Sequence, residues 1–164
     1  MNEYCQLIET AEDYMRLMLM RHGDALNTRP DANRALSPVG MSEVRANALR
    51  LLEAPWRPSM IVHSPLRRAV ETAELVANCL DFGSPLTTWD ELVPNGDCRY
   101  LLRKLAGSGD ESPLLVTHQP LISTFIEYLT SESVRVGTAY TAGIQLDEFL
   151  PSTGQLLWFL DTPV

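Results

Sequence analysis

The chain alternates short apolar runs with longer stretches in which apolar residues recur at helical spacing. The runs at residues 17–20, 59–62 and 114–116 are short and uninterrupted, which is typical of strands buried on both faces. Each run is followed by a helical pattern. This alternation predicts a mostly parallel sheet with helices on both faces, which is a three-layer αβα sandwich of the α/β class.

The helical patterns have recognisable starts and ends. Ser37 and Pro38 have the order of an N-cap and a first helical residue, and the apolar face that follows consists of Val44, Ala48, Leu51 and Leu52. Similar patterns cover residues 69–80, 97–105 and 121–129, and residues 107–109 indicate a loop. Residues 142–149 and 155–160 predict a hairpin, or two strands, that completes the sheet.

Length and composition favour one globular domain. A chain of 164 residues buries roughly two-thirds of its unfolded surface without disulfides or metals. We expect residues 15–164 to form this domain and residues 1–14 to be a short N-terminal extension. The extension is acidic and lacks the pattern of a signal peptide, and no apolar run approaches the ~20 residues that cross a bilayer. The cysteine pattern fits a reducing cytoplasm, so we expect a cytoplasmic protein.

The charge balance restricts the partners. Thirteen basic and twenty-one acidic residues give a net charge of −8, which argues against nucleic acids and anionic membranes. Any site for an anion must therefore be local. The three cysteines, Cys5, Cys79 and Cys98, are widely spaced and contain no CxxC pair, so they indicate neither a disulfide framework nor a zinc site.

Polar residues follow each of the three apolar strands. They are Arg21, His22 and Gly23 after the first strand, His63 and Ser64 with Arg68 one turn later after the second, and Thr117 and His118 after the third. Neighbouring parallel strands would bring these ends to one edge of the sheet. Two arginines and a histidine pair at one point suit a bound phosphoryl group, and a histidine there can act as a nucleophile. Any one of these residues alone is more often structural.

Together these residues resemble the histidine phosphatase superfamily. The resemblance rests on Arg21-His22-Gly23, on the segment Ser64-Pro65-x-x-Arg68-Ala69-x-x-Thr72 and on His118. It implies the phosphoglycerate mutase-like fold and a phosphorylated histidine intermediate. Within the superfamily, RHGDA at 21–25, LSPVG at 36–40, ELVPNGD at 91–97 and THQPL at 117–121 resemble SixA-type phosphohistidine phosphatases.

The resemblance implies a role for each matching residue. His22 would be the nucleophile, Arg21 and Arg68 would hold the phosphate, and His118 would be a further donor to it. We expect no metal and no other cofactor, a phosphorylated histidine of a phosphotransfer or carrier protein as substrate, inorganic phosphate as product and a role in signal transduction. His63 departs from the family pattern and is expected to point away from the site.

The general acid is the least defined part of the site. Only about fifty residues separate Arg68 from His118, which leaves little room for a cap, so we expect no large cap insertion. The candidate acids are Glu91 and Asp24. Neutral imidazole leaves more readily than an alkoxide, which favours a phosphohistidine substrate. Two alternatives stay open: a phosphatase of small phosphomonoesters such as sugar or nucleotide phosphates, and a phosphoprotein-binding module without catalysis.

Overall fold

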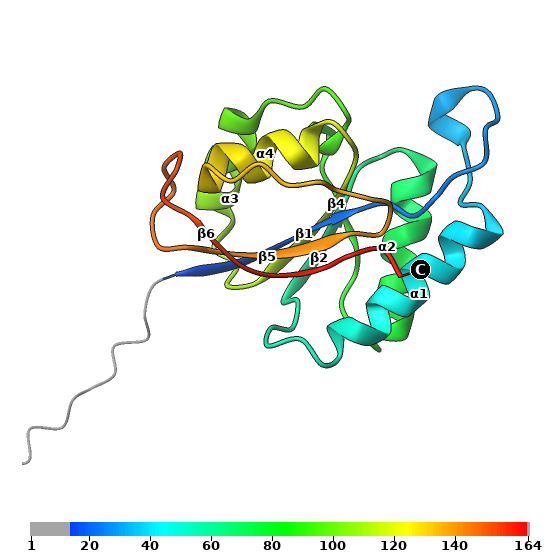
Figure 1. Ribbon diagram of the computed structural model, residues 1–164, viewed down its shortest axis with the longest axis horizontal. Helices are drawn as coiled ribbons and strands as arrows, with labels where there is room; N and C mark the ends of the chain where they lie inside the picture. Colours follow the sequence, from blue (N-terminus) through cyan, green and yellow to red (C-terminus); the bar gives the residue numbers. More distant parts are fainter. Residues whose placement is uncertain (1–13, 164) are drawn as a thin grey trace, which may run out of the picture.

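One mixed sheet organises the part of the chain that the computed structural model describes, residues 14–163 (Figure 1). Its strand order is β3-β2-β4-β1-β5-β6. The strands are β1 Met15–Arg21, β2 Met60–His63, β3 Thr87–Thr88, β4 Pro113–Thr117, β5 Thr141–Leu146 and β6 Gln155–Leu160. β3, β2, β4 and β1 pair in parallel, whereas β5 and β6 are antiparallel to their neighbours. The mostly parallel sheet is confirmed.

Helices cover both faces of this sheet. The four helices are α1 Pro38–Leu51, α2 Arg67–Cys79, α3 Cys98–Ser108 and α4 Leu121–Thr130, and two 3-10 turns, η1 Asp31–Asn33 and η2 Asp90–Leu92, lie in the connections. α1 and α2 lie on one side of the sheet, and α3 and α4 lie on the other (Figure 1). The architecture is therefore the three-layer sandwich that the sequence predicts.

The central position of β1 in the sheet explains why residues 17–20 are apolar without interruption. Successive side chains of a strand point to opposite faces. Leu17 and Leu19 accordingly pack in the core beneath α3 and α4, while Met18 and Met20 pack in the core beneath α1 and α2. All four side chains are fully buried. A strand between two helical layers has no face on which a polar residue would be solvated.

Two details of the helices differ from the sequence prediction. Ser37 caps α1 as expected, with its hydroxyl accepting from the Gly40 amide at 3.0 Å. Leu52, however, follows the last helical residue and is 39% exposed, so its assignment to the buried face was wrong. The loop predicted for residues 107–109 was also wrong in part. α3 continues through Ser108, and Gly109 then ends it with a left-handed φ of 70°.

The predicted extension, residues 1–14, lies outside the described residues apart from Tyr14. The assignment of residues 15–164 to a single domain stays a prediction. Within residues 14–163, none of the helices combines the length and the apolarity needed to cross a bilayer.

Candidate active site

The candidate active site lies where three neighbouring parallel strands end. β4 lies between β1 and β2 in the sheet. Arg21 at the end of β1 is in register with Thr117 of β4, and His63 of β2 is in register with Val116. One further backbone bond, from the His22 amide to the Thr117 carbonyl, holds the chain beyond β1 at the same level. The three polar strand ends therefore converge, as the sequence predicts.

His22 presents an unprotonated ring nitrogen to this site. Its Nδ1 lies 2.7 Å from the Gly23 carbonyl oxygen, which can only accept, so Nδ1 carries the hydrogen. Nε2 then has a free lone pair and accepts a hydrogen bond from Arg68 Nε at 3.3 Å. Burial, together with the positive charges of Arg68 and Arg21, lowers the pKa of His22 to about 4. The ring is therefore neutral near pH 7, with Nε2 available as a nucleophile.

The turn after His22 depends on glycine and on Thr72. The Gly23 amide donates to the Thr72 hydroxyl at 3.2 Å, and that hydroxyl donates to the Arg68 carbonyl at 2.7 Å. A Cβ at position 23 would lie 2.7 Å from both the Gly40 carbonyl oxygen and a methyl group of Val44. Only glycine permits α1 to approach this closely. The position of the His22 ring is thus fixed through both helices on this face.

Arg68 is held by a carboxylate that the sequence analysis did not identify. Arg68 is the second residue of α2 and is only 4% exposed. Its Nη1 donates to the Asp31 carbonyl at 3.0 Å and its Nη2 to the Asp31 carboxylate at 3.2 Å. The bond from Arg34 and the charge of Arg68 outweigh the effect of burial and lower the pKa of Asp31. Asp31 therefore remains ionised and fixes the guanidinium of Arg68 from the side of the loop.

His118 lies beside His22, with 4.9 Å between the two ring centroids. Its Nε2 is 2.7 Å from the Ser64 hydroxyl. Burial is the main cause that lowers the pKa of His118 to about 3, and the positive charge of Arg68 acts in the same direction. His118 is therefore neutral near pH 7, and its Nδ1 is buried without a hydrogen-bond partner within residues 14–163.

Arg21 is anchored by the loop that precedes β5. Its Nη1 donates to the Val136 carbonyl at 3.1 Å, and its Nε is buried without a partner in the described part of the chain. The same loop binds the backbone of His22, because the Ala139 amide donates to the His22 carbonyl. Asn47 of α1, which is fully buried, donates from Nδ2 to the Ala139 carbonyl at 2.8 Å. Asn47 is a second residue that the sequence patterns did not single out.

The two candidate acids already have partners elsewhere. Glu91 accepts from Lys104 Nζ at 2.7 Å, and Asp24 accepts from the Ser37 hydroxyl at the start of α1. Across residues 14–163, no hydrogen bond joins either carboxylate to His22, Arg68 or His118. His63 donates from Nδ1 to the Ser64 carbonyl at 2.8 Å and belongs to β2, so it has a local structural bond.

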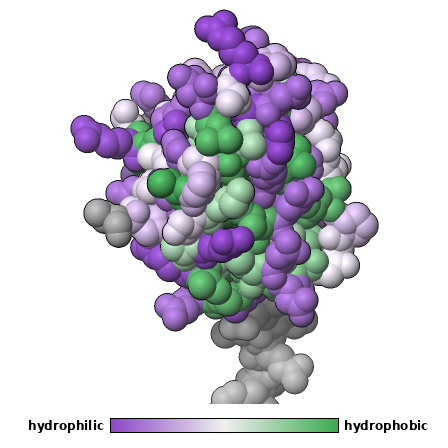
Figure 2. Space-filling model, turned by 90° about the vertical axis from the view of Figure 1, so that its right-hand side faces the viewer, coloured by the Kyte–Doolittle hydropathy of each residue, from purple (hydrophilic) through white to green (hydrophobic). Residues whose placement is uncertain are grey.

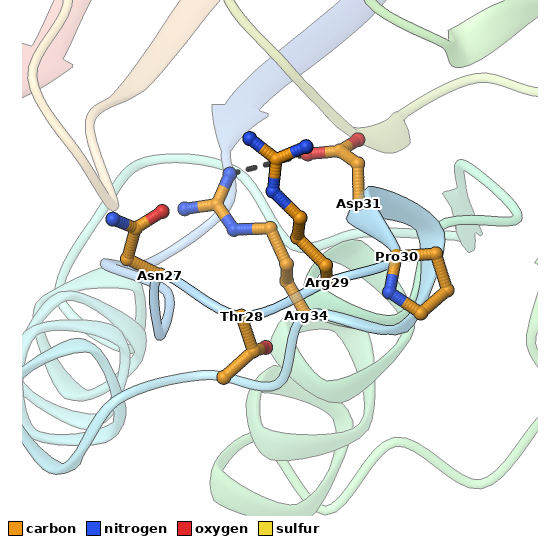
Figure 3. Close-up of a pocket in the computed structure, with 6 residues that line it drawn as sticks. All are labelled: Asn27, Thr28, Arg29, Pro30, Asp31 and Arg34. Atoms are coloured by element: carbon orange, nitrogen blue, oxygen red, sulfur yellow. Dashed lines mark hydrogen bonds and ion pairs between the residues drawn. The ribbon is translucent and has the colours of Figure 1, made fainter.

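A hollow of about 630 Å³ lies in the loop between β1 and α1 (Figure 3). It is lined by Asn27, Thr28, Arg29, Pro30, Asp31 and Arg34. The side chains of Arg29 and Arg34 both extend towards Asp31, and Arg34 forms an ion pair with it at 3.3 Å (Figure 3). Because Asp31 also contacts Arg68, the hollow adjoins the cluster around His22. The end of the molecule that carries this loop mixes hydrophobic and hydrophilic residues on its surface (Figure 2).

The fold and the cluster of arginines and histidines define a phosphoryl-transfer enzyme of one known class. Residues 17–94 match the histidine phosphatase superfamily (branch 1), and the chain belongs to this superfamily. This chain is similar to the phosphohistidine phosphatase SixA of Escherichia coli (strain K12). The two are 32% identical over 140 residues, which cover 82% of this chain and 87% of SixA.

Solved structures agree with this assignment. The structure of the protein histidine phosphatase SixA complexed with tungstate superposes with a TM-score of 0.81 at 31% identity, covering 90% of this chain and 97% of that one. The putative phosphohistidine phosphatase SixA from Agrobacterium tumefaciens has a TM-score of 0.74 at 23% identity, covering 89% and 97% of the two chains. At that identity the second match supports the fold alone.

Proposed function

We propose that this protein removes phosphoryl groups from phosphohistidine residues of other proteins, with His22 as the nucleophile. The observation that carries the proposal is the neutral His22 ring, whose Nε2 lone pair lies 3.3 Å from Arg68 Nε. Nε2 attacks phosphorus, a new N–P bond forms, and the N–P bond of the substrate breaks with its electron pair left on the departing imidazole. Water then attacks the phosphorus on His22, and the Nε2–P bond breaks with its electron pair returning to Nε2. The proton that the water loses passes to solvent, and inorganic phosphate leaves.

Arg21, Arg68 and His118 bind the transferring group. Phosphoryl transfer has little covalent chemistry for a protein to perform, so catalysis is mainly positioning and charge stabilisation on the phosphoryl oxygens. Two guanidinium groups supply positive charge, and the charge of each lowers the pKa of both His22 and His118. Arginine suits this role because its planar fork of donors matches phosphate oxygens. The proposed steps therefore use only side chains of this chain.

The leaving group supports phosphohistidine over a phosphomonoester. An alcohol leaves as a strongly basic alkoxide unless an acid protonates it, whereas the conjugate acid of imidazole has a pKa of about 6.5. Glu91 is paired with Lys104 and Asp24 with Ser37, so neither is free to protonate a leaving group at His22. A site that protonates the leaving group only weakly suits imidazole, which needs less protonation than an alkoxide.

The surroundings of the site support a protein substrate. The open hollow and the mixed polar and apolar surface suit a phosphorylated side chain on a carrier or phosphotransfer protein (Figure 2). SixA is the named relative with this activity, and its complex with tungstate shows that this relative binds a tetrahedral oxyanion. We propose a cytoplasmic location, which the free thiols of Cys79 and Cys98 support because they suit a reducing compartment. We propose a role in signal transduction because the substrate is a phosphorylated carrier or phosphotransfer protein.

The test is phosphate release from a phosphohistidine carrier protein, alongside a panel of small phosphomonoesters. We expect the wild type to dephosphorylate the carrier and the His22→Ala variant to lose this activity, with Arg103→Ala on the exposed side of α3 as the control. Turnover of the small esters alone would refute the leaving-group argument. Binding of the phosphorylated carrier without turnover by the wild type would instead establish a binding module.

A further inference from the structure

The two ring nitrogens of His118 have different surroundings. Nε2 is 2.7 Å from the hydroxyl oxygen of Ser64, the first residue after β2. Nδ1 is buried, and within residues 14–163 it has no hydrogen-bond partner. The residue as a whole is only 1% exposed. Since a neutral imidazole carries one hydrogen, the position of that hydrogen decides whether Nδ1 is a donor or an acceptor.

The bonds to Ser64 decide between these two forms. The Ser64 hydroxyl oxygen accepts from the Leu66 amide at 3.2 Å, and the hydroxyl itself has a single hydrogen to donate. If Nε2 of His118 also donated to this oxygen, the hydroxyl hydrogen would have no acceptor among the described residues, although Ser64 is fully buried. If the hydroxyl donates to Nε2, the Leu66 amide, the Ser64 hydroxyl and His118 Nε2 all have hydrogen-bond partners. Buried polar groups in folded proteins are almost always paired, so the second arrangement holds.

This arrangement leaves the hydrogen of His118 on Nδ1. Nδ1 is then a buried donor without an acceptor in a cluster that also contains the guanidinium groups of Arg21 and Arg68. A lone pair at the same place would repel the oxygens of a phosphoryl group, whereas an N–H bond would attract them. The chemistry that satisfies Nδ1 is therefore an anionic oxygen brought by the substrate.

We propose that Ser64 is a positioning residue that holds His118 in its Nδ1–H tautomer and so makes it a neutral hydrogen-bond donor to the transferring phosphoryl group. This inference rests on the proposed function and adds to it the residue that orients His118. Ser64 can do so because its own orientation is fixed by the Leu66 amide at the start of α2. Residues that orient a reactive histidine through its second nitrogen act in the same way at other sites.

The proposal has a direct spectroscopic signature. The chain contains three histidines, so the side-chain spectrum of ¹⁵N-histidine-labelled protein is simple. Free imidazole side chains in water favour the Nε2–H form. Here His22 and His63 both donate from Nδ1 to backbone carbonyls. With His118 as proposed, all three histidines are Nδ1–H tautomers near pH 7, and the His118 signals can be assigned with a His118→Gln variant.

Ser64→Ala, with Ser64→Thr as the conservative variant, tests the proposal. In Ser64→Ala we expect the His118 spectrum to change to a mixture that includes the Nε2–H form. The kcat for phosphate release from the carrier should fall about tenfold to a hundredfold, with a smaller change in KM. Ser64→Thr keeps the hydroxyl and should restore the Nδ1–H signal and most of kcat. In the wild type, added tungstate should shift the His118 Nδ1–H resonance, because a tetrahedral oxyanion supplies the missing acceptor.

The outcomes separate this proposal from the proposed function. An Nε2–H histidine in the wild-type spectrum overturns it even if no variant folds. His22 and His63 both donate from Nδ1, so counting the tautomers needs only the native protein. An unchanged tautomer in Ser64→Ala, or a changed tautomer with unchanged kcat, also overturns it. The wild type could instead show the Nδ1–H tautomer but fail to dephosphorylate the carrier. That result would overturn the proposed function, while the inference that Ser64 orients the His118 ring would stand.

Discussion

Replacement of Asn47 by leucine tests how the loop before β5 is held against the site. Asn47 is fully buried on α1, and its Nδ2 donates to the carbonyls of Ala139 at 2.8 Å and Asp161 at 3.1 Å. The Ala139 residue in turn binds the His22 backbone. Leucine has a similar volume but no donor. Asn47→Leu therefore removes both of these bonds while it keeps the packing of α1. It also removes the bond that Asn47 Oδ1 accepts from Arg50 Nη1 at 2.8 Å, but Arg50 Nη1 keeps the Asp161 carbonyl as an acceptor.

The expected loss follows from what each carbonyl retains. Thr141 Oγ1 still donates to the Ala139 carbonyl at 3.3 Å, and Arg50 Nη1 still donates to the Asp161 carbonyl at 2.9 Å. A buried polar group that loses its partner costs about 1–3 kcal/mol, and a carbonyl that keeps a second donor lies near the lower end of this range. Two such losses predict a decrease of about 2–3 kcal/mol in the free energy of unfolding.

Urea titration followed by circular dichroism measures this decrease. The midpoint concentration should fall while the slope m stays the same, which indicates a change in stability alone. Arg45→Ala, at an exposed position of the same helix, is the matched control and should change the free energy of unfolding by no more than about 0.5 kcal/mol. A decrease below about 1 kcal/mol for Asn47→Leu would refute the assignment, because it would mean that both carbonyls are satisfied without the amide.

Four further predictions concern the site. Because the pKa of His22 in the free protein is lowered to about 4, kcat/KM should hold as the pH falls from 7 to about 5 and decline around pH 4. A decline centred near pH 6.5 would contradict the neutral nucleophile. The free energy of unfolding should also decrease as the pH falls from about 6.5 to about 4, because over this range the unfolded chain binds a proton that folded His22 does not. Asp31→Asn removes the charge that fixes Arg68 and should lower kcat/KM about fivefold, and equal values for this variant and an Asp90→Asn control would refute that role. Arg29→Glu in the hollow should raise KM for an acidic carrier protein about fivefold, more than Arg103→Glu does, and equal effects would argue that the hollow does not contact the carrier. Excess chelator should leave phosphate release from the carrier unchanged, because the guanidinium groups supply the positive charge, and loss of turnover would show that a metal takes part.

The site could be predicted from the sequence where its information is local. Each apolar run marks a buried strand, and the polar residue after it must lie at the end of that strand, so His22, Ser64 and His118 could be placed without a structure. Their convergence required one more condition, that β1, β4 and β2 are neighbours. The strand order satisfies this condition.

Contacts between distant segments could not be predicted in this way. Asp31 lies in a polar loop 37 positions before Arg68, and nothing in that loop indicates which of its side chains turns back to α2. Asn47 lies on the buried face of α1, three residues after Val44 and four before Leu51, but its polar side chain gave no reason to count it in the core. It is buried there because two carbonyls accept from its amide. The periodicity also continues one residue past Leu51, where α1 ends, which is why Leu52 was misplaced.

The direction of β5 determines where the molecule can be modified. Because β5 runs antiparallel to β1, the turn that joins it to β6 lies at the far end of the sheet from His22 (Figure 1). Six residues of β5 separate the two ends by roughly 20 Å. Phe149 and Leu150 at this turn are exposed. A fluorescent dye or a surface tether attached there would report on or immobilise the enzyme while leaving the mouth of the site open to a protein substrate.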